Sequence, residues 1–450
     1  MEKFFKLKEN GTDVRKEVIA GVTTFLTMAY IIAVNPGILS KTGMPAGALV
    51  TATCLTAGLA TILMGLYANL PFALASGMGL NAFFAFSVCG KGIHWSVALT
   101  AVFFEGIIFI ILSATNVREA VVNAIPNTLK IAVTGGIGLF IAFIGFVNAG
   151  IVVKNDATLV SMGNFTTPTV IIAVIGIIVI VALSKKNIKG AILWGILVSS
   201  ICAWIYALVN PNLASKYMIF LPKKVFAFES LSDIAFKLDF SYVMDSTKIW
   251  TFITIVLTFL FVDFFDTVGT LVGVASKVGM VDKDGKVPRA GKALMVDSIG
   301  TTFGAMLGTS TVTTYVESSA GVAEGGRTGL TAVVTGVLFL IAMFFSPIFT
   351  AIPACATAPA LIVVGYYMME NIVKINFADF TEGVPAFLTI ALMPLTYSIG
   401  DGLTIGILAY VILNLINNII TKKKEDKKKI SIVMYILAIL FIIKLVATGL

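Results

Sequence analysis

Long apolar stretches follow one another along most of the chain, and they restrict it to a lipid environment. Runs of roughly 17–25 apolar residues are long enough to cross a bilayer as helices. About fourteen can be delimited, at 17–35, 46–69, 72–88, 95–113, 130–148, 168–184, 189–209, 249–275, 292–308, 311–324, 328–346, 352–371, 384–398 and 401–420. Only 12% of the residues are charged, against about 25% in a soluble domain. The chain is therefore predicted to be an all-α membrane protein that moves a small solute, and not an enzyme.

The basic residues lie between the apolar runs. They precede the first run, occupy the sixth and eighth loops, and follow the fourteenth run: Lys3, Lys6, Lys8, Arg15 and Lys16; Lys185, Lys186 and Lys189; Lys277, Lys283, Lys286, Arg289 and Lys292; and the segment 422–429. If the N-terminus is cytoplasmic, all of these lie on the inner side, as the positive-inside rule requires. The net charge of +8 is then explained by topology in a multi-pass protein of the cell (plasma) membrane, and a nucleic-acid partner is not expected.

The residues that commonly bind metals are few and scattered. Cys54, Cys89, Cys202 and Cys355 lie far apart in apolar runs, where thiols usually act as small hydrophobic groups. The single histidine, His94, lies at a helix edge. No pair has the spacing of metal ligands, so we expect neither a metal site nor an organic cofactor.

Two of the fourteen elements are unusual for membrane spans. The third (70–86) and the tenth (306–329) are short and rich in Gly, Ser and Thr. Such backbone is tolerated at membrane depth only where it is buried in protein or lines a cavity. They stand seven elements apart, and 189–201 resembles 401–413 at the same interval. Because seven is odd, a second copy is inverted relative to the first, as in many secondary transporters.

This duplication divides the chain into six parts. We expect a cytoplasmic arm at 1–16, a first inverted repeat at 17–209, an extracytoplasmic loop at 210–248, a second repeat at 249–420, a basic cytoplasmic segment at 421–429, and a further apolar segment at 430–450. The last segment either spans the bilayer or lies in its interface.

Ionisable groups inside spans are costly, so they are candidates for function. Asp263 and Asp266 lie three residues apart on one helix face of the eighth element, and Glu317 lies in the tenth. Asp263 could instead only orient the site, and Glu317 could pair with Arg327 or a loop lysine. Glu105, in the fourth element, is an alternative functional carboxylate. Near predicted ends, where a hydrated or capping role is favoured, lie Asp297, Glu324 and Asp401.

The third element adds an uncharged polar group, which can donate hydrogen bonds as well as accept them. Asn81 follows Gly77 and Gly79, so it either contacts the solute or caps a half-helix. The hydroxyls of the tenth element are its counterpart: Thr309, Ser310, Thr311, Thr313 and Thr314. Phe83, Phe84 and Phe86 are expected to pack in the core. Carboxylates together with amide donors permit a planar heterocycle as the solute, although a cation satisfies the carboxylates equally well.

Four stretches together resemble the nucleobase/ascorbate transporters (nucleobase–cation symporters), in the AzgA-like branch of purine permeases. They are EVIAGVTTFLTMAYIIAVNP (17–36), SGMGLNAFFAF (76–86), FVDFFDTVGTLVGVA (261–275) and LGTSTVTTYVESSAGVAEGGRTGL (307–330). The resemblance implies seven plus seven inverted helices, in which the third and tenth elements begin as short strands and continue as half-helices between a core domain and a gate domain. A homodimer is common in that family.

The resemblance also assigns roles to residues. It implies binding of a purine nucleobase by Asp266, Glu317 and Asn81, and we add Leu80, Val316 and Thr270 to the candidate binding residues. Asp266, Glu317 and Asp263 are the candidates for coupling transport to a cation, expected to be H+. Some uracil-type members have histidine where this chain has Thr270, so a histidine relay is not expected.

Three other functions fit parts of the pattern. An anion carrier of the same inverted-repeat fold disagrees with the two carboxylates of the site. An intramembrane aspartyl protease needs two aspartates from different helices, whereas Asp263 and Asp266 share one. A passive channel differs from a symporter in lacking uphill uptake. Adenine, guanine and hypoxanthine all remain compatible with the residues, as does sodium in place of the proton.

Overall fold

The computed structural model describes residues 2–115, 125–277, 289–421 and 427–449. In the first half the helices are α1 (Glu2–Phe5), α2 (Val14–Met28), α3 (Ile31–Leu39), α4 (Ala46–Leu63), α5 (Met78–Ala82), α6 (Trp95–Ala114), α8 (Asn127–Ala149), α9 (Pro168–Lys185), α10 (Ala191–Val209) and α11 (Pro211–Lys216). They are followed by α12 (Ser241–Met244), α13 (Ile249–Lys277), α14 (Ala290–Leu307), α15 (Ser318–Ala323), α16 (Gly329–Ala342), α17 (Ser346–Thr350), α18 (Ala354–Met369), α19 (Phe380–Leu395), α20 (Ile399–Ile420) and α21 (Ile432–Gly449).

The predicted elements are present in order, with one irregular element in each half. Within the described ranges, 8 helices are long and apolar enough to cross a membrane, and four shorter apolar helices accompany them. The third and tenth elements begin with the strands β1 (Leu74–Ser76) and β4 (Val312–Thr314), which continue into α5 and α15. The prediction of an all-α membrane fold with short strands at these two places is confirmed.

Equivalent elements of the two halves make equivalent contacts. The fourth element, α6, packs on the ninth, α14, and their counterparts, α16 and α4, pack on each other. The pair α9–α10 of the first half likewise corresponds to the pair α19–α20 of the second. Since each half has an odd number of elements, one half is inverted relative to the other. The chain therefore has the predicted 7+7 inverted-repeat fold.

The elements form two groups, which we call the core group and the gate group. The core group contains α2–α6, α13–α16 and the strands β1 and β4, whereas the gate group contains α8–α10 and α18–α20. Glycines allow the gate helices α8 and α18 to pack closely. A Cβ on Gly138 would lie 2.7 Å from the backbone oxygen of Gly365. Small residues at such crossings are typical of helices that pack inside membranes.

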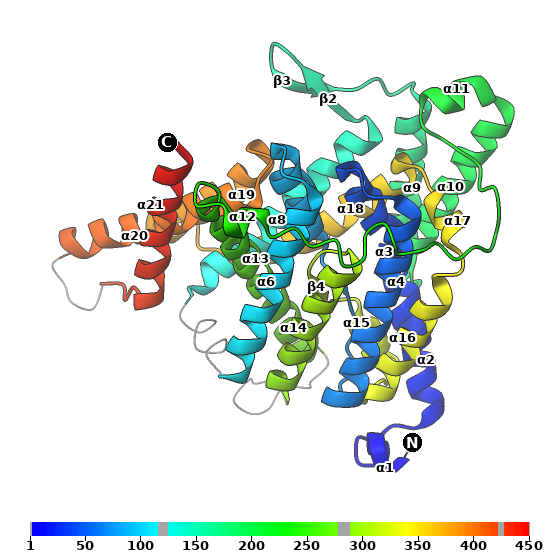
Figure 1. The fold of residues 1–450 in the computed structure, drawn as a ribbon, viewed down its shortest axis with the longest axis horizontal. Coiled ribbons are helices and arrows are strands. Elements are labelled where there is room, and N and C mark those ends of the chain that lie inside the picture. Colours follow the sequence, from blue (N-terminus) through cyan, green and yellow to red (C-terminus); the bar gives the residue numbers. More distant parts are fainter. Residues whose placement is uncertain (1, 116–124, 278–288, 422–426, 450) are drawn as a thin grey trace.

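Some parts of the structure were not predicted. A hairpin of β2 (Val152–Asn155) and β3 (Leu159–Met162) follows α8, and α11 and α12 lie in the loop between the halves. Figure 1 shows the hairpin and α11 at the end of the molecule opposite α1. The apolar segment whose placement the sequence left open forms α21, which packs against α20 and α13 at the side of the molecule (Figure 1).

Candidate functional site

The two interrupted elements meet through an antiparallel strand pair buried in the core group. Leu74 pairs with Thr314 and Ser76 with Val312. The backbone N–H of Ala73 donates to Ser318 Oγ at 3.0 Å, and this contact extends the pairing to the start of α15. The half-helices α5 and α15 thus begin at opposite ends of three residue pairs, about 10 Å apart at the spacing of a strand. The eighth element, α13, packs against α5, α15 and β4.

Glu317 lies at the turn between β4 and α15, where it is half-buried. The hydroxyl of Tyr30 donates to its Oε1 at 2.6 Å. Tyr30 is fully buried at the break between α2 and α3, so the first and tenth elements share this contact. The alternative pairing with Arg327 is wrong, because that guanidinium donates to the backbone oxygens of Val322 and Gly326.

Asn81 is fully buried in the last turn of α5. Its cap role is excluded, because Gly77 is the residue that precedes the helix. Within the described part of the chain, neither its amide nitrogen nor its amide oxygen has a hydrogen-bond partner. A buried amide without partners costs about 1–3 kcal/mol, so its retention is typical of a group that binds a ligand.

A pair of buried carboxylates joins the eighth and ninth elements. Thr267 Oγ1 lies 2.9 Å from Asp263 Oδ1 and 3.3 Å from both carboxylate oxygens of Asp297. Both aspartates are fully buried. The expectation of a hydrated or capping role for Asp297 is therefore wrong, because this residue lies inside α14. Its position five residues after the start of the predicted run 292–308 was the signal that could have identified it.

The remaining candidates lie around the strand pair. The Thr311 hydroxyl donates to Glu105 Oε2 at 2.7 Å, so this buried carboxylate holds β4 against α6. Thr309 Oγ1 accepts from Asn35 and bonds to Ser76. These two hydroxyls of the tenth element thus connect parts of the core group.

The other predicted binding residues differ in burial, and the side chain of one of them is not described. Leu80 is fully buried in α5, and Val316 is exposed beside Glu317. Thr270 is half-buried on α13. Asp266 belongs to the same helix, but its side chain lies outside the described residues. The structure therefore brings Tyr30 to Glu317 and Asp263 to Asp297, and it places Asn81 on the facing half-helix.

The phenylalanines of the third element pack against other rings, and His94 caps a helix. Phe83 meets Phe259 edge-on with ring centroids 4.8 Å apart, and Phe86 meets Tyr397 at 5.6 Å. These contacts confirm the packing role expected for the phenylalanines of the third element. His94 caps α6, since its ring accepts from the backbone N–H of Ser96.

Comparisons with known proteins cover nearly the whole chain. The family described as a permease family matches residues 15–405. The adenine permease AdeP of Escherichia coli (strain K12) is 42% identical and aligns with 99% of this chain and 96% of its own. The guanine/hypoxanthine permease PbuG of Bacillus subtilis (strain 168) is 44% identical, over 98% and 99%.

Solved structures share the architecture. The transmembrane domain of the cyanobacterium bicarbonate transporter BicA has a TM-score of 0.64 to this chain, covering 86% of it and 96% of that domain. The sequences are only 14% identical, so this likeness concerns the fold alone.

Proposed function

Because this chain belongs to the permease family, we propose that it imports purine nucleobases by symport with a proton. Membership agrees with the resemblance drawn from the four sequence stretches, and it confirms that the chain is a transporter and not an enzyme. The relatives named as adenine and guanine/hypoxanthine permeases support a purine as the substrate. The observation that carries the proposal is the pair formed by the Tyr30–Glu317 contact and the unpartnered Asn81 on opposite half-helices.

A purine offers donors and acceptors that match these groups. The Glu317 carboxylate accepts from a ring N–H, and the Asn81 amide both donates to a ring nitrogen or carbonyl and accepts from an amino group. Asp266 is the proposed second carboxylate of the site, since its helix packs against both half-helices. Leu80, Val316 and Thr270 are proposed to shape the site around the ring.

The coupling proton is proposed to reside on the carboxylates of the eighth to tenth elements. Asp263 and Asp297 both lie within hydrogen-bond distance of the Thr267 hydroxyl, so a proton bound at this pair is proposed to lie beside the site. Asp266 and Glu317 remain the other candidates. One proton moving down 100 mV releases about 2.3 kcal/mol, which corresponds to about 50-fold accumulation of the substrate.

Transport is proposed to proceed by movement of the core group against the gate group. The site residues named above all belong to the core group, so a rigid displacement would carry the solute with it. The protein is proposed to lie in the plasma membrane with a cytoplasmic N-terminus, because the basic N-terminal arm and the basic sixth and eighth loops then lie on the inner side. A homodimer is compatible with this arrangement.

The test is uptake of labelled hypoxanthine and adenine by proteoliposomes, with a panel of competing purines and with or without an uncoupler. We expect uphill uptake that collapses with the proton gradient and does not depend on sodium. Glu317→Gln and Asp266→Asn should each abolish it while the protein still reaches the membrane. Full uptake by both variants would refute the assigned roles, and uptake unaffected by the uncoupler would refute proton coupling.

An anion carrier is the second candidate, because the fold is shared with a bicarbonate transporter. The half-buried Glu317 disfavours an anion at the same place, since like charges repel most strongly away from water. Uptake of labelled sulfate or bicarbonate instead of purines would reverse the choice.

A further inference from the structure

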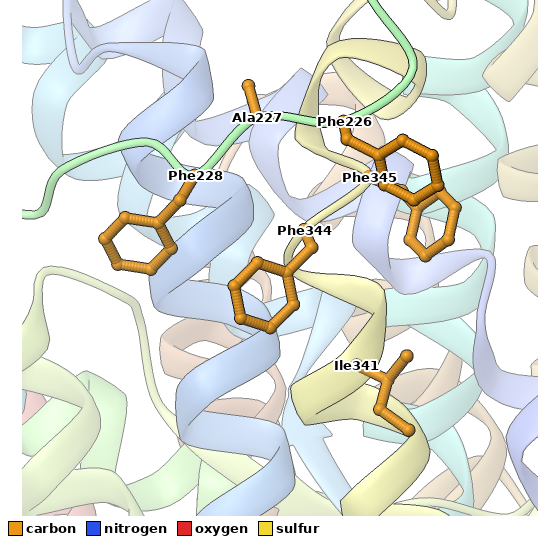
Figure 2. A pocket seen from close by; sticks show the side chains of 6 residues that line it. All are labelled: Phe226, Ala227, Phe228, Ile341, Phe344 and Phe345. Carbon is orange, nitrogen blue, oxygen red and sulfur yellow. The ribbon is translucent and has the colours of Figure 1, made fainter.

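An apolar groove lies outside the candidate site, and its inner part lies between the two helix groups. Its outer part has a volume of about 510 Å³ and is lined by Phe226, Ala227, Phe228, Ile341, Phe344 and Phe345. Figure 2 shows that the first three come from the loop between the halves, that Ile341 lies on α16, and that Phe344 and Phe345 directly follow this helix. The inner part, of about 320 Å³, shares Ile341 and Phe345 with the outer part, so the two adjoin at these side chains.

The inner part lies between α10 of the gate group and α2, α16 and α17. Trp204 of α10 lines it, and the indole N–H of this residue donates to the Ala351 backbone oxygen at 3.2 Å. Tyr30 lines it from the opposite group. Because the Tyr30 hydroxyl donates to Glu317, the end of the groove is one side chain away from the candidate site.

The lining indicates what fills the groove. Phe226 is 65% exposed, Phe228 59% and Phe344 46%, and water in an apolar channel has few groups to bond. The groove continues the outer face of α16, where Val337 and Ile341 are also exposed, as expected of a surface that contacts lipid. The acyl chains of lipids are therefore the apolar groups available to fill the groove.

The loop that forms the outer wall also carries positive charge. Lys223 and Lys224 are exposed and immediately precede Val225 and Phe226. Lysines beside an apolar surface keep the ammonium group at the headgroup level, where each favours an anionic lipid by about 1 kcal/mol. We propose that this groove binds an anionic phospholipid, with one acyl chain between the groups and the phosphate at Lys223 and Lys224.

The position of the lipid gives it an influence on transport. A chain lying between α10 and α16 must shift whenever the gate group moves against the core group. Occupancy should therefore change the rate of uptake, a consequence that rests on the proposed function. Binding itself does not depend on transport, so the two are tested separately.

Fluorescence of Trp204 reports on the groove directly. In a variant with Trp95, Trp194 and Trp250 each changed to Phe, only Trp204 remains. In nanodiscs we expect a brominated anionic phosphatidylglycerol to quench it at about a 30-fold lower mole fraction than brominated phosphatidylcholine, because two lysines contribute about 1 kcal/mol each. Lys223→Gln with Lys224→Gln should remove this preference, whereas Lys216→Gln with Lys237→Gln, in the same loop, should retain it.

A second variant tests the groove independently of charge. Ile341→Phe narrows both parts at a half-exposed position and should weaken quenching by both lipids. Equal quenching by the two lipids in the parent, or a preference unchanged by the Lys223/Lys224 substitutions, would overturn the headgroup assignment. Absence of quenching, or undiminished quenching in Ile341→Phe, would overturn the acyl-chain site. Uptake measured with and without phosphatidylglycerol then tests the influence on transport, and a chain without purine uptake would leave the quenching result standing.

Discussion

Asn81 combines full burial with an amide that has no partner among the described residues. Replacing it with Leu removes the unbonded polar atoms and keeps a similar volume. We therefore expect Asn81→Leu to abolish purine uptake while raising the apparent free energy of unfolding by about 1 kcal/mol, because no hydrogen bond is lost. Uptake assays and unfolding in mixed micelles measure the two effects.

Asn35 provides the matched control. Its amide donates to Thr53 at 2.7 Å and to Thr309 at 3.1 Å, so it is buried but bonded. Asn35→Leu should lower the free energy of unfolding by about 1–3 kcal/mol. If Asn81→Leu destabilised the protein as much as Asn35→Leu, the interpretation of Asn81 as an amide reserved for a ligand would be wrong.

The hydroxyl of Tyr30 can be removed by a substitution that changes a single heavy atom beside the Glu317 carboxylate. Tyr30→Phe removes the donor at 2.6 Å and leaves the ring in place. Hydrogen bonds to charged groups contribute about 1.5–3 kcal/mol, so we expect at least a tenfold fall in the initial rate of uptake. Tyr366→Phe, at a residue 69% exposed, should leave uptake unchanged. If the two variants had the same initial rate of uptake, the Tyr30 hydroxyl would not contribute to the function of Glu317.

At the scale of elements, the start of α16 depends on a carboxylate from another helix. Glu17 of α2 accepts from the backbone N–H groups of Arg327, Thr328 and Thr331 at 2.8, 3.2 and 3.0 Å. The side chain also accepts from the Thr331 hydroxyl. Because the first N–H groups of a helix have no partner within it, Glu17 replaces the missing acceptors and joins the first element to the eleventh.

Glu17→Ala should consequently destabilise the fold. We expect a loss of about 2–4 kcal/mol in the free energy of unfolding, with faster hydrogen exchange at Thr328–Thr331. Glu9→Ala breaks only an exposed pair with Lys6 and should cost less than about 1 kcal/mol. A Glu17→Ala protein as stable as Glu9→Ala would show that water replaces the carboxylate at no cost.

At the scale of the whole molecule, an ion pair among the described residues joins the two helix groups. Lys189, between α9 and α10, lies 3.3 Å from Glu324 at the end of α15. With the four cysteines replaced, Lys189→Cys and Glu324→Cys can be joined by a short thiol-reactive linker. We expect the linked protein to bind substrate but to lose most of its uptake, because the gate group can no longer move against the core group.

A second pair joins α19 of the gate group to the segment that follows α20, and it does not link the gate group to the core group. Lys428 bonds to Glu382 at 2.8 Å, and Glu382 accepts from Thr128 of α8. Linking cysteines at positions 428 and 382 should leave uptake unchanged. Loss of uptake in both linked proteins, or in neither, would contradict a rigid movement of one group against the other.

The sequence alone determined the class of the protein and the number and order of its membrane elements. Apolar length decides whether a segment enters lipid, and this property is local. The interruption of the third and tenth elements was predictable for a similar reason, since Gly, Ser and Thr at membrane depth mark irregular backbone, whereas the short strands at 74–76 and 312–314 were implied by the family resemblance. Glu317 and Asn81 stood out because polar groups in apolar runs are rare.

Contacts between distant elements were decided only by the tertiary structure. No pattern within the first element indicates that Tyr30 reaches Glu317, 287 positions away, or that Glu17 completes α16. Asp297 was misjudged because its burial depends on where α13 and α14 cross, and the apolar groove exists only because α10 packs beside α16. Burial and partners depend on packing between helices, which residue type and spacing along one helix do not specify.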